Sequence, residues 1–327
     1  MTSCVITSIL PEILSFLKQL VCIGGPTASG KTALAIALAQ IFNTEIVSFD
    51  SRQIYKELNI GVARPQLKQL QSVKHHFIAE LSVTEHYSVG DYVRQALERV
   101  NSLFLAHDTV IAVGGTGFYL DSLVHPLDEM PAIDDTMRQQ AANFIASHSL
   151  DEVKQKVNEI DPIQFERMDT NNLLRMQRVL EIYFQTGLPM SSFFANKTKC
   201  NLPDIKIHRF ALLPERKSLY QKIDLRVLEM IDAGLVSEVN SLKEFRYLKA
   251  LNTVGYKEFV HYFDGIQNLE TTIKEIQQHS RNYAKRQYTW FRNQSDWTAI
   301  ASENLQDQLA EISFLLDLGI QQSEDDK

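Results

Sequence analysis

Cysteine is scarce in this 327-residue sequence, and long apolar runs are absent. The three cysteines, Cys4, Cys22 and Cys200, lie far apart, which predicts neither a disulfide framework nor a zinc site and fits a reducing cytoplasm. No apolar run approaches the ~20 residues that cross a bilayer, so we expect no membrane association. The N-terminal segment has no basic start and Lys18 interrupts it, which indicates a helical N-terminal extension over residues 1–18 rather than a signal peptide.

An excess of basic residues is also absent, because 33 Lys and Arg stand against 40 Asp and Glu, a formal net charge of −7. Residues 300–327 hold seven acidic residues and only Lys327, a net −6 that leaves −1 for the other 299 residues. We therefore predict an acidic C-terminal tail over residues 300–327. Local patches decide whether a protein binds phosphates, so the acidic total does not exclude a nucleic-acid partner.

Residues 25–32 form the most informative motif, G-x-x-x-x-G-K-T. An apolar run at residues 20–23 predicts a strand before it, and an alanine-rich run predicts a helix after it. A phosphate-binding P-loop requires this context, and the alternative is a chance glycine-rich turn. We expect backbone N–H groups and the charge of Lys31 to bind a pyrophosphate or polyphosphate, and the Thr32 hydroxyl to hold Mg²⁺. The predicted pyrophosphate-binding residues are Gly25, Pro26, Thr27, Ala28, Ser29, Gly30, Lys31 and Thr32.

Strand-like and helix-like patterns alternate up to about residue 125. This alternation predicts an α/β fold of the P-loop NTPase type, a parallel sheet with helices on both faces. Strands are predicted at 20–23, 45–49, 109–113 and 207–213, and helices at 31–42, 87–106, 117–124, 216–233, 235–245 and 269–292. Between the third and fourth strands, residues 126–135 resemble a linker and residues 136–195 read as helices alone. We predict a P-loop catalytic core of residues 19–130 and 205–299, with residues 131–204 as an inserted all-helical domain.

Two strand ends carry further candidate residues. Asp50 ends the strand at 45–49, where a carboxylate can act as a general base or hold Mg²⁺ through water, or can instead cap the next turn. The strand at 109–113 ends in Gly114-Gly115-Thr116-Gly117 and lacks the metal-binding aspartate of a simple ATPase. Thr116 is therefore a candidate substrate contact, or part of a tight turn that opens a helix.

Basic residues on two predicted helices are candidate RNA contacts. Arg175 and Arg178 share one helix face, although a solvated basic face is the commoner explanation. Near the C-terminal end, Arg281, Lys285, Tyr288 and Arg292 follow helical spacing, flanked by Tyr283, Trp290 and the polar Gln287. Basic stripes with aromatics suit phosphates and unstacked bases. The alternative is a core-facing aromatic edge with a charged back.

Over residues 20–297 these motifs resemble, in order, those of the bacterial tRNA dimethylallyltransferases, also called tRNA isopentenyltransferases. The matching stretches begin with Gly24 to Thr32, Asp50 to Tyr55, His75 to Ile78 and Gly114 to Tyr119. They continue with Arg175 to Glu181, Thr186 to Pro189, Val254 to Tyr256 and Ala284 to Arg292.

The resemblance implies a reaction and its partners. Such enzymes transfer a dimethylallyl group from dimethylallyl pyrophosphate to N6 of the adenine 3′ of the anticodon, in tRNAs that read codons beginning with U. It implies Mg²⁺ as cofactor, a monomer in the cytoplasm, and contact with the anticodon stem-loop. Asp50 becomes the general base, Thr116 a contact to adenine and donor, and Arg226 a ligand of pyrophosphate. The implied tRNA-binding residues are Asp50, Ser51, Arg52, Gln53, Arg138, Leu174, Arg175, Met176, Gln177, Arg178, Asn252, Thr253, Val254, Gly255, Tyr256, Lys257, Arg281, Tyr283, Ala284, Lys285, Arg286, Gln287, Tyr288, Thr289 and Trp290.

The sequence also departs from the family and leaves alternatives open. Gly61-Val62-Ala63-Arg64-Pro65 stands where family members carry Gly-Thr-x-Lys-Pro, so the threonine hydroxyl is lost while the charge is kept. The stretch after His76 continues with Ala79-Glu80 rather than an early aspartate, and no residues here could supply the zinc finger of eukaryotic members. A nucleotide kinase, an adenylate isopentenyltransferase acting on free nucleotides and a non-catalytic tRNA-binding module are the competing hypotheses.

Overall fold

The computed structural model describes residues 18–194 and 200–316. The chain divides into two compact units, one formed by residues up to Val124 together with those from Asn201, the other by His125–Cys200. Most of the predicted N-terminal extension, including Cys4, and the last eleven residues of the predicted tail lie outside the described residues.

The first unit is built on a parallel sheet with the strand order β3-β2-β4-β1-β5-β6. Its strands are β1 (Gln19–Gly24), β2 (Ile46–Ser48), β3 (His75–His76), β4 (Thr109–Val113), β5 (Lys206–Leu212) and β6 (Thr298–Ile300). The four predicted strands are confirmed within one or two residues at each end. The edge strands β3 and β6 were missed because two or three residues carry no readable alternation. The α/β, P-loop NTPase-like prediction is therefore confirmed, with every strand pair in the ladder parallel.

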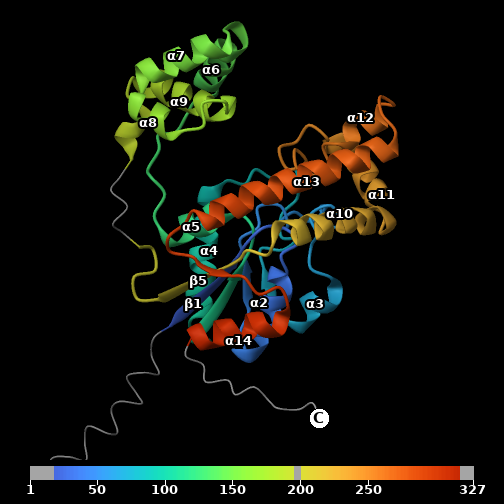
Figure 1. Ribbon diagram of the computed structural model, residues 1–327. Coiled ribbons are helices and arrows are strands. Elements are labelled where there is room, and N and C mark those ends of the chain that lie inside the picture. Colours follow the sequence, from blue (N-terminus) through green and yellow to red (C-terminus); the bar gives the residue numbers. More distant parts are fainter. Residues whose placement is uncertain (1–17, 195–199, 317–327) are drawn as a thin grey trace, which may run out of the picture. The chain divides into compact units, whose positions relative to one another are not determined.

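Alternation along the strands builds two cores, one on each face of the sheet (Figure 1). Val21 and Ile23 of β1 face the core shared with α2 (Lys31–Ile41) and α14 (Leu305–Leu315). Leu20 and Cys22 face the other core, which α4 (Val89–Leu103) and α5 (Gly117–Val124) help to form. Burial raises the pKa of the Cys22 thiol to about 12, so this cysteine is an inert core residue.

Four helices of the first unit extend the second core around the carboxyl ends of the strands: α10 (Arg216–Asp232), α11 (Leu235–Ser241), α12 (Phe259–Phe263) and α13 (Leu269–Arg292). A short 3-10 turn lies at Lys243–Phe245, and helix α3 (Leu67–Ser72) lines the cleft described below. Helix α13 packs along α10, where Ala284 meets Leu219 and Ile223. None of the described helices is both long and apolar enough to pass through a membrane.

The second unit is a small helical bundle. It contains α6 (Asp135–Ser147), α7 (Leu150–Ile160), α8 (Pro162–Arg167) and α9 (Leu173–Thr186), followed by a 3-10 turn at Met190–Phe193. Helix α9 packs against α6 and α7 through its buried face, which includes Met176 and Val179. Ser149 and Glu152 form a capping box that starts α7, and Gly187 ends α9 with a left-handed φ of 72°.

The predicted acidic tail begins too early. Residue 300 is the last of strand β6, and α14 lies against α2 in the sheet's core, with Ile312 fully buried. The acidic residues of this helix lie on its outer side, so counting charge hid an amphipathic pattern in which Gln308 and Ile312 face inward. Residues 300–316 belong to the fold.

Replacing Ile312 by alanine should lower the free energy of unfolding by about 2–5 kcal/mol, because it opens a cavity in the core beneath α14. Phe314→Ala on the same helix is the matched control, since the Phe314 side chain is 81% exposed and its loss should change stability by no more than about 0.5 kcal/mol. Chemical denaturation of both variants measures the difference. Equal stabilities would show that α14 is not part of the cooperative unit.

Candidate functional site

A cleft of about 930 Å³ lies at the carboxyl ends of the strands of the first unit. In an open parallel sheet this edge is where ligands bind, because the loops after neighbouring strands converge there. It is lined by the P-loop after β1, by Ser48 at the end of β2 and Asp50 after it, and by Gly114 and Gly115 after β4. Helices α10 and α13 close it with Arg226, Tyr283 and Gln287.

The P-loop has the backbone that its sequence predicts. Gly25 has a φ of 140°, and a Cβ there would lie 2.6 Å from the carbonyl oxygen of Leu212. Gly30, with a φ of 93°, is the N-cap of α2, and no side chain caps that helix and no acidic residue stands in its first turn. The first N–H groups of α2 are therefore left for an anion.

Two basic side chains, Lys31 and Arg226, line the cleft beside this loop, with the carboxylates of Asp50 and Glu229 nearby. Burial lowers the pKa of Lys31 to about 7, an effect that nearby Asp50 opposes and nearby Arg226 reinforces. Burial likewise lowers the pKa of Arg226, which Glu229 partly offsets. The Lys31 ammonium donates to the carbonyl of Pro26 at 2.6 Å. Half-buried positive charge beside a P-loop attracts a multivalent anion.

The structure shows the capping role that was predicted for Asp50, and its role as a base stays a prediction. Its Oδ1 accepts hydrogen bonds from the N–H groups of Arg52 at 2.9 Å and Gln53 at 3.3 Å, so it caps the turn that follows β2. Its Oδ2 has no hydrogen-bond partner among the described residues and Asp50 lines the cleft. One oxygen therefore orders the loop, and the other is left to accept a proton.

Thr116 lies behind the cleft wall rather than on it. Its Oγ1 accepts from the N–H of Ser51 at 3.2 Å and lies 3.4 Å from the Ser51 hydroxyl. Tyr283 of α13 lies beside Thr116, and burial together with nearby Asp50 raises the Tyr283 pKa to about 12. Thr116 thus ties the loop after β2 to the loop after β4.

The inner face of α13 corrects a sequence-based interpretation. Gln287 is 7% exposed, and both ends of its amide are bonded to the loops of the first unit, so it is not free to read a base. Ala284 is fully buried. Arg281 forms an ion pair with Asp224 of α10, so the predicted stripe does not lack acidic partners. The spacing of Ala284, Gln287 and Phe291 at i, i+3 and i+7 could have placed Gln287 on the apolar face.

The outer face of α13 stays a candidate RNA surface. Lys285, Arg286 and Arg292 are exposed and form no ion pair with the described residues. Tyr288 is half-buried beneath the Arg216 guanidinium, 5.0 Å from its ring, and Trp290 packs edge-to-face against Phe291. The aromatic side chains therefore face inward, as the core-facing interpretation of this helix predicts, and the charged side chains face outward. Thr289 is half-buried.

The remaining candidate tRNA residues are split between the two units. Arg52, Gln53, Thr253, Val254 and Gly255 line the cleft, while Asn252 and Lys257 are exposed nearby in the chain. In the second unit, Leu174 and Arg175 are exposed, Arg138 pairs with Asp135, and Gln177 and Arg178 both bond to Glu181. The side chains of Met176 and Tyr256 are 0% and 2% exposed, so a side-chain contact with RNA is wrong for both.

Two side chains that the sequence analysis did not count as site residues, Glu238 and Arg64, hold the loops of the cleft. The Glu238 carboxylate accepts from the N–H groups of residues 59, 60 and 61 at 3.3, 2.8 and 3.1 Å, and from the Tyr256 hydroxyl at 2.6 Å. Arg64 donates to the carbonyls of Tyr55 and Lys56, both at 2.8 Å, and of Leu58. The basic residue of the divergent 61–65 stretch is therefore used for local structure.

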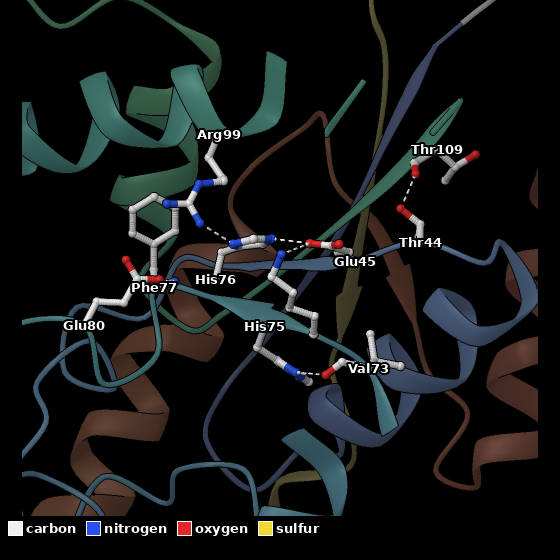
Figure 2. Close-up of polar contacts among 10 residues, drawn as sticks. Thr44, Glu45, Val73, His75, His76, Phe77, Glu80, Arg99 and Thr109 are labelled. Carbon is white, nitrogen blue, oxygen red and sulfur yellow. Dashed lines mark hydrogen bonds and ion pairs between the residues drawn. The ribbon is translucent and has the colours of Figure 1, made fainter. Parts of the chain in front are cut away.

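His76 anchors the edge strand β3 (Figure 2). Its Nδ1 accepts from Arg99, so Nε2 carries the proton and donates to Glu45 at 2.6 Å, while Lys74 lies 3.1 Å from the same carboxylate. Burial lowers the pKa of His76, which favours the neutral ring that this network needs. The histidine pair in the resembling motif thus supports the sheet edge, and His75 Nδ1 bonds to the Val73 carbonyl.

Residues 53–294 match the family model for IPP transferase. The tRNA dimethylallyltransferase of Christiangramia forsetii is 41% identical over 276 residues, covering 84% of this chain and 90% of the relative. The tRNA dimethylallyltransferase 2 of Azobacteroides pseudotrichonymphae is 36% identical over 301 residues, covering 92% of this chain and 97% of the relative. The solved structure of the tRNA isopentenylpyrophosphate transferase from Bacillus halodurans aligns with a TM-score of 0.67 at 31% identity, over 92% of this chain and 96% of that one. The chain therefore belongs to the IPP transferase family, a family of prenyltransferase enzymes.

Proposed function

We propose that this protein transfers a dimethylallyl group from dimethylallyl pyrophosphate to N6 of the adenine 3′ of the anticodon in tRNA. One observation carries the proposal. A single cleft holds two half-buried basic side chains, Lys31 and Arg226, beside a P-loop and next to the carboxylate of Asp50. The curated relatives, which are named as tRNA dimethylallyltransferases, support the choice of donor and acceptor.

The part of the cleft beside the P-loop suits a pyrophosphate leaving group, which carries negative charge away from the prenyl carbon. Breaking the allylic C–O bond places negative charge on pyrophosphate, and preorganised donors stabilise that charge where it develops. The α2 N-terminus, the Lys31 ammonium and the Arg226 guanidinium supply these donors within one wall of the cleft. The loop after β4 ends in glycines, so it lacks the aspartate that a nucleotide kinase or ATPase uses at this place.

The site also suits Mg²⁺ bound together with pyrophosphate. Among the described residues, no group of three or more His, Cys, Asp or Glu side chains could hold a metal ion unaided. Thr32 lines the cleft at the start of α2, and the buried Ser29 hydroxyl has no hydrogen-bond partner. Thr32 would contribute one oxygen and the pyrophosphate others, and the ion would neutralise charge on the leaving group.

The acceptor side places a base opposite the donor. An adenine that enters the cleft must leave the stack of the anticodon loop, which costs little in a single-stranded loop. Asp50 Oδ2 would take the proton that N6 loses as the new C–N bond forms. Free adenylate is the competing acceptor, and the exposed cations on the outer face of α13 favour tRNA over it.

Incubation with labelled dimethylallyl pyrophosphate, Mg²⁺ and unmodified tRNA should label the tRNA, and AMP in its place should not be labelled.

Asp50→Asn should lower the single-turnover rate by roughly 10²–10⁴-fold and leave tRNA affinity unchanged. Asparagine keeps the oxygen that caps residues 52 and 53, so the loop stays ordered. Label in AMP alone would refute the proposal, and a loss confined to tRNA binding would make Asp50 a binding residue.

Binding of dimethylallyl pyrophosphate at pH 8 should take up close to one proton. Lys31 has a pKa of about 7 in the free protein, so it is mostly neutral at pH 8, and a bound anion returns its pKa toward 10.5. Affinity should therefore fall as the pH rises above about 7. Calorimetry in two buffers of different ionisation enthalpy measures the uptake. Lys31→Arg, which stays charged throughout, is the control, and equal uptake in both proteins would contradict the assignment.

Affinity for tRNA should fall steeply with salt although the protein is acidic, because each phosphate contact adds roughly −0.7 to −0.9 to the slope of log K against log salt. Lys285→Gln with Arg292→Gln should flatten that slope by about one to two and leave affinity for the prenyl donor unchanged. Lys274→Gln on the same helix is the control, because Lys274 is already paired with Glu270 at 2.6 Å. An unchanged slope in the double variant would remove α13 from the RNA surface.

A further inference from the structure

The side-chain amide of Gln287 joins two loops of the cleft that are far apart in sequence. Its Oε1 accepts from the N–H of Thr27 in the P-loop at 2.9 Å, and its Nε2 donates to the carbonyl of Gly115 after β4 at 2.9 Å. The residue is 7% exposed, so water does not compete freely for these bonds. Because one end of the link must accept and the other must donate, a primary amide suits it and a carboxylate or thioether does not.

The contact with Gly115 is unusually close. A Cβ built on Gly115 would lie 2.2 Å from Nε2 of Gln287 and 3.3 Å from its Cδ. Any larger residue at position 115 therefore displaces the amide. The glycines after β4 serve this approach to α13 as well as lining the cleft.

Helix α13 contacts the loop after β4 at three successive positions of its inner face. Tyr283 lies beside Thr116, Gln287 hydrogen-bonds to Gly115, and the Trp290 ring lies against Gly117, where a Cβ would approach it to 2.0 Å. Of these three side chains, Gln287 alone also holds the P-loop through a hydrogen bond. The same helix carries the exposed cations Lys285 and Arg286 on its other face.

We infer that Gln287 is a positioning residue for the prenyl transfer proposed above, on which this inference rests. It fixes the distance between the P-loop, where the donor's pyrophosphate would bind, and the loop after β4, whose Thr116 accepts from the N–H of Ser51 next to the proposed base Asp50. The reacting carbon of the donor and N6 of the adenine must lie close together for the C–N bond to form. A misplacement of about 1 Å lowers the rate by on the order of 10²-fold. Gln287 touches neither reactant. It acts through the two loops.

Gln287→Met keeps the length and removes both hydrogen bonds, while Gln287→Glu keeps the acceptor and sets an oxygen against the Gly115 carbonyl. Both should lower the single-turnover rate at saturating donor and tRNA by about 10–100-fold and change the tRNA dissociation constant less than twofold. Gln278→Met is the control, since Gln278 is exposed on α13 and bonds to Asn282 of its own helix. A weaker tRNA affinity with a normal rate at saturation would make Gln287 an RNA contact and overturn the inference.

A double-mutant cycle with Gly115 separates positioning from a general loss of structure. Gly115→Ala should slow transfer because its Cβ displaces the amide, and Gln287→Ala should slow it by removing the amide. If both act through this one link, the double variant should be no slower than the slower single variant, with folding checked by thermal unfolding. If the two single effects on the rate multiply in the double variant, the link is refuted.

A wild-type protein that transfers no prenyl group refutes the proposed function, whereas an active wild type with an equally active Gln287→Met refutes the positioning role alone.

Discussion

The cleft depends on a concentration of positive charge at the carboxyl edge of the sheet. Arg226 lies near enough to Lys31 to lower its pKa further, an effect that nearby Asp50 opposes, and Glu229 partly offsets the effect of burial on the pKa of Arg226. Such an arrangement costs free energy in the empty protein, because charges removed from water need partners. A pyrophosphate brings several negative charges to this point and relieves the cost, so the features that destabilise the free site favour binding of the donor.

Helix α13 extends this constraint from the donor to the acceptor. Its inner face packs on the core and bonds to both reactive loops, and its outer face leaves Lys285, Arg286 and Arg292 in solvent. One helix therefore carries the surface that we propose for RNA and also holds two loops of the cleft together. Rigid elements hold catalytic geometry better than loops do, because their backbone hydrogen bonds are already made within the helix. The ion pair of Arg281 with Asp224 joins α13 to α10, the helix that supplies Arg226.

The sequence predicted those parts of the protein whose signal is local. The P-loop is a continuous motif with a strand before it and a helix after it, and the positive φ of Gly25 and Gly30 follows from its glycines. Asp50 could be placed at a strand end, because a buried strand reads as an apolar run. Helix α14 was hidden by its acidic residues, since counting charge ignores which side of a helix carries it, and strand β6 was too short to show an alternation. The prediction that Gln287 reads a base was wrong because it was drawn from the charged residues near Gln287. The apolar spacing of Ala284, Gln287 and Phe291 places Gln287 on the buried face instead.

The contacts that sequence could not supply share a physical form, in which one side chain bonds to the backbone of a distant loop. Gln287 bonds to the backbone of Thr27 and Gly115, Glu238 to that of residues 59–61, and Arg64 to the carbonyls of the turn before it. A backbone N–H or carbonyl is the same group in almost every residue, so the partner end leaves no mark in the sequence. Such links nonetheless set the shape of the cleft, because its walls are loops without ladder hydrogen bonds of their own. The candidate reactive residues of this site can therefore be recognised from sequence motifs. The dimensions of the cleft depend on polar side chains whose hydrogen-bond partners are known only from the folded chain.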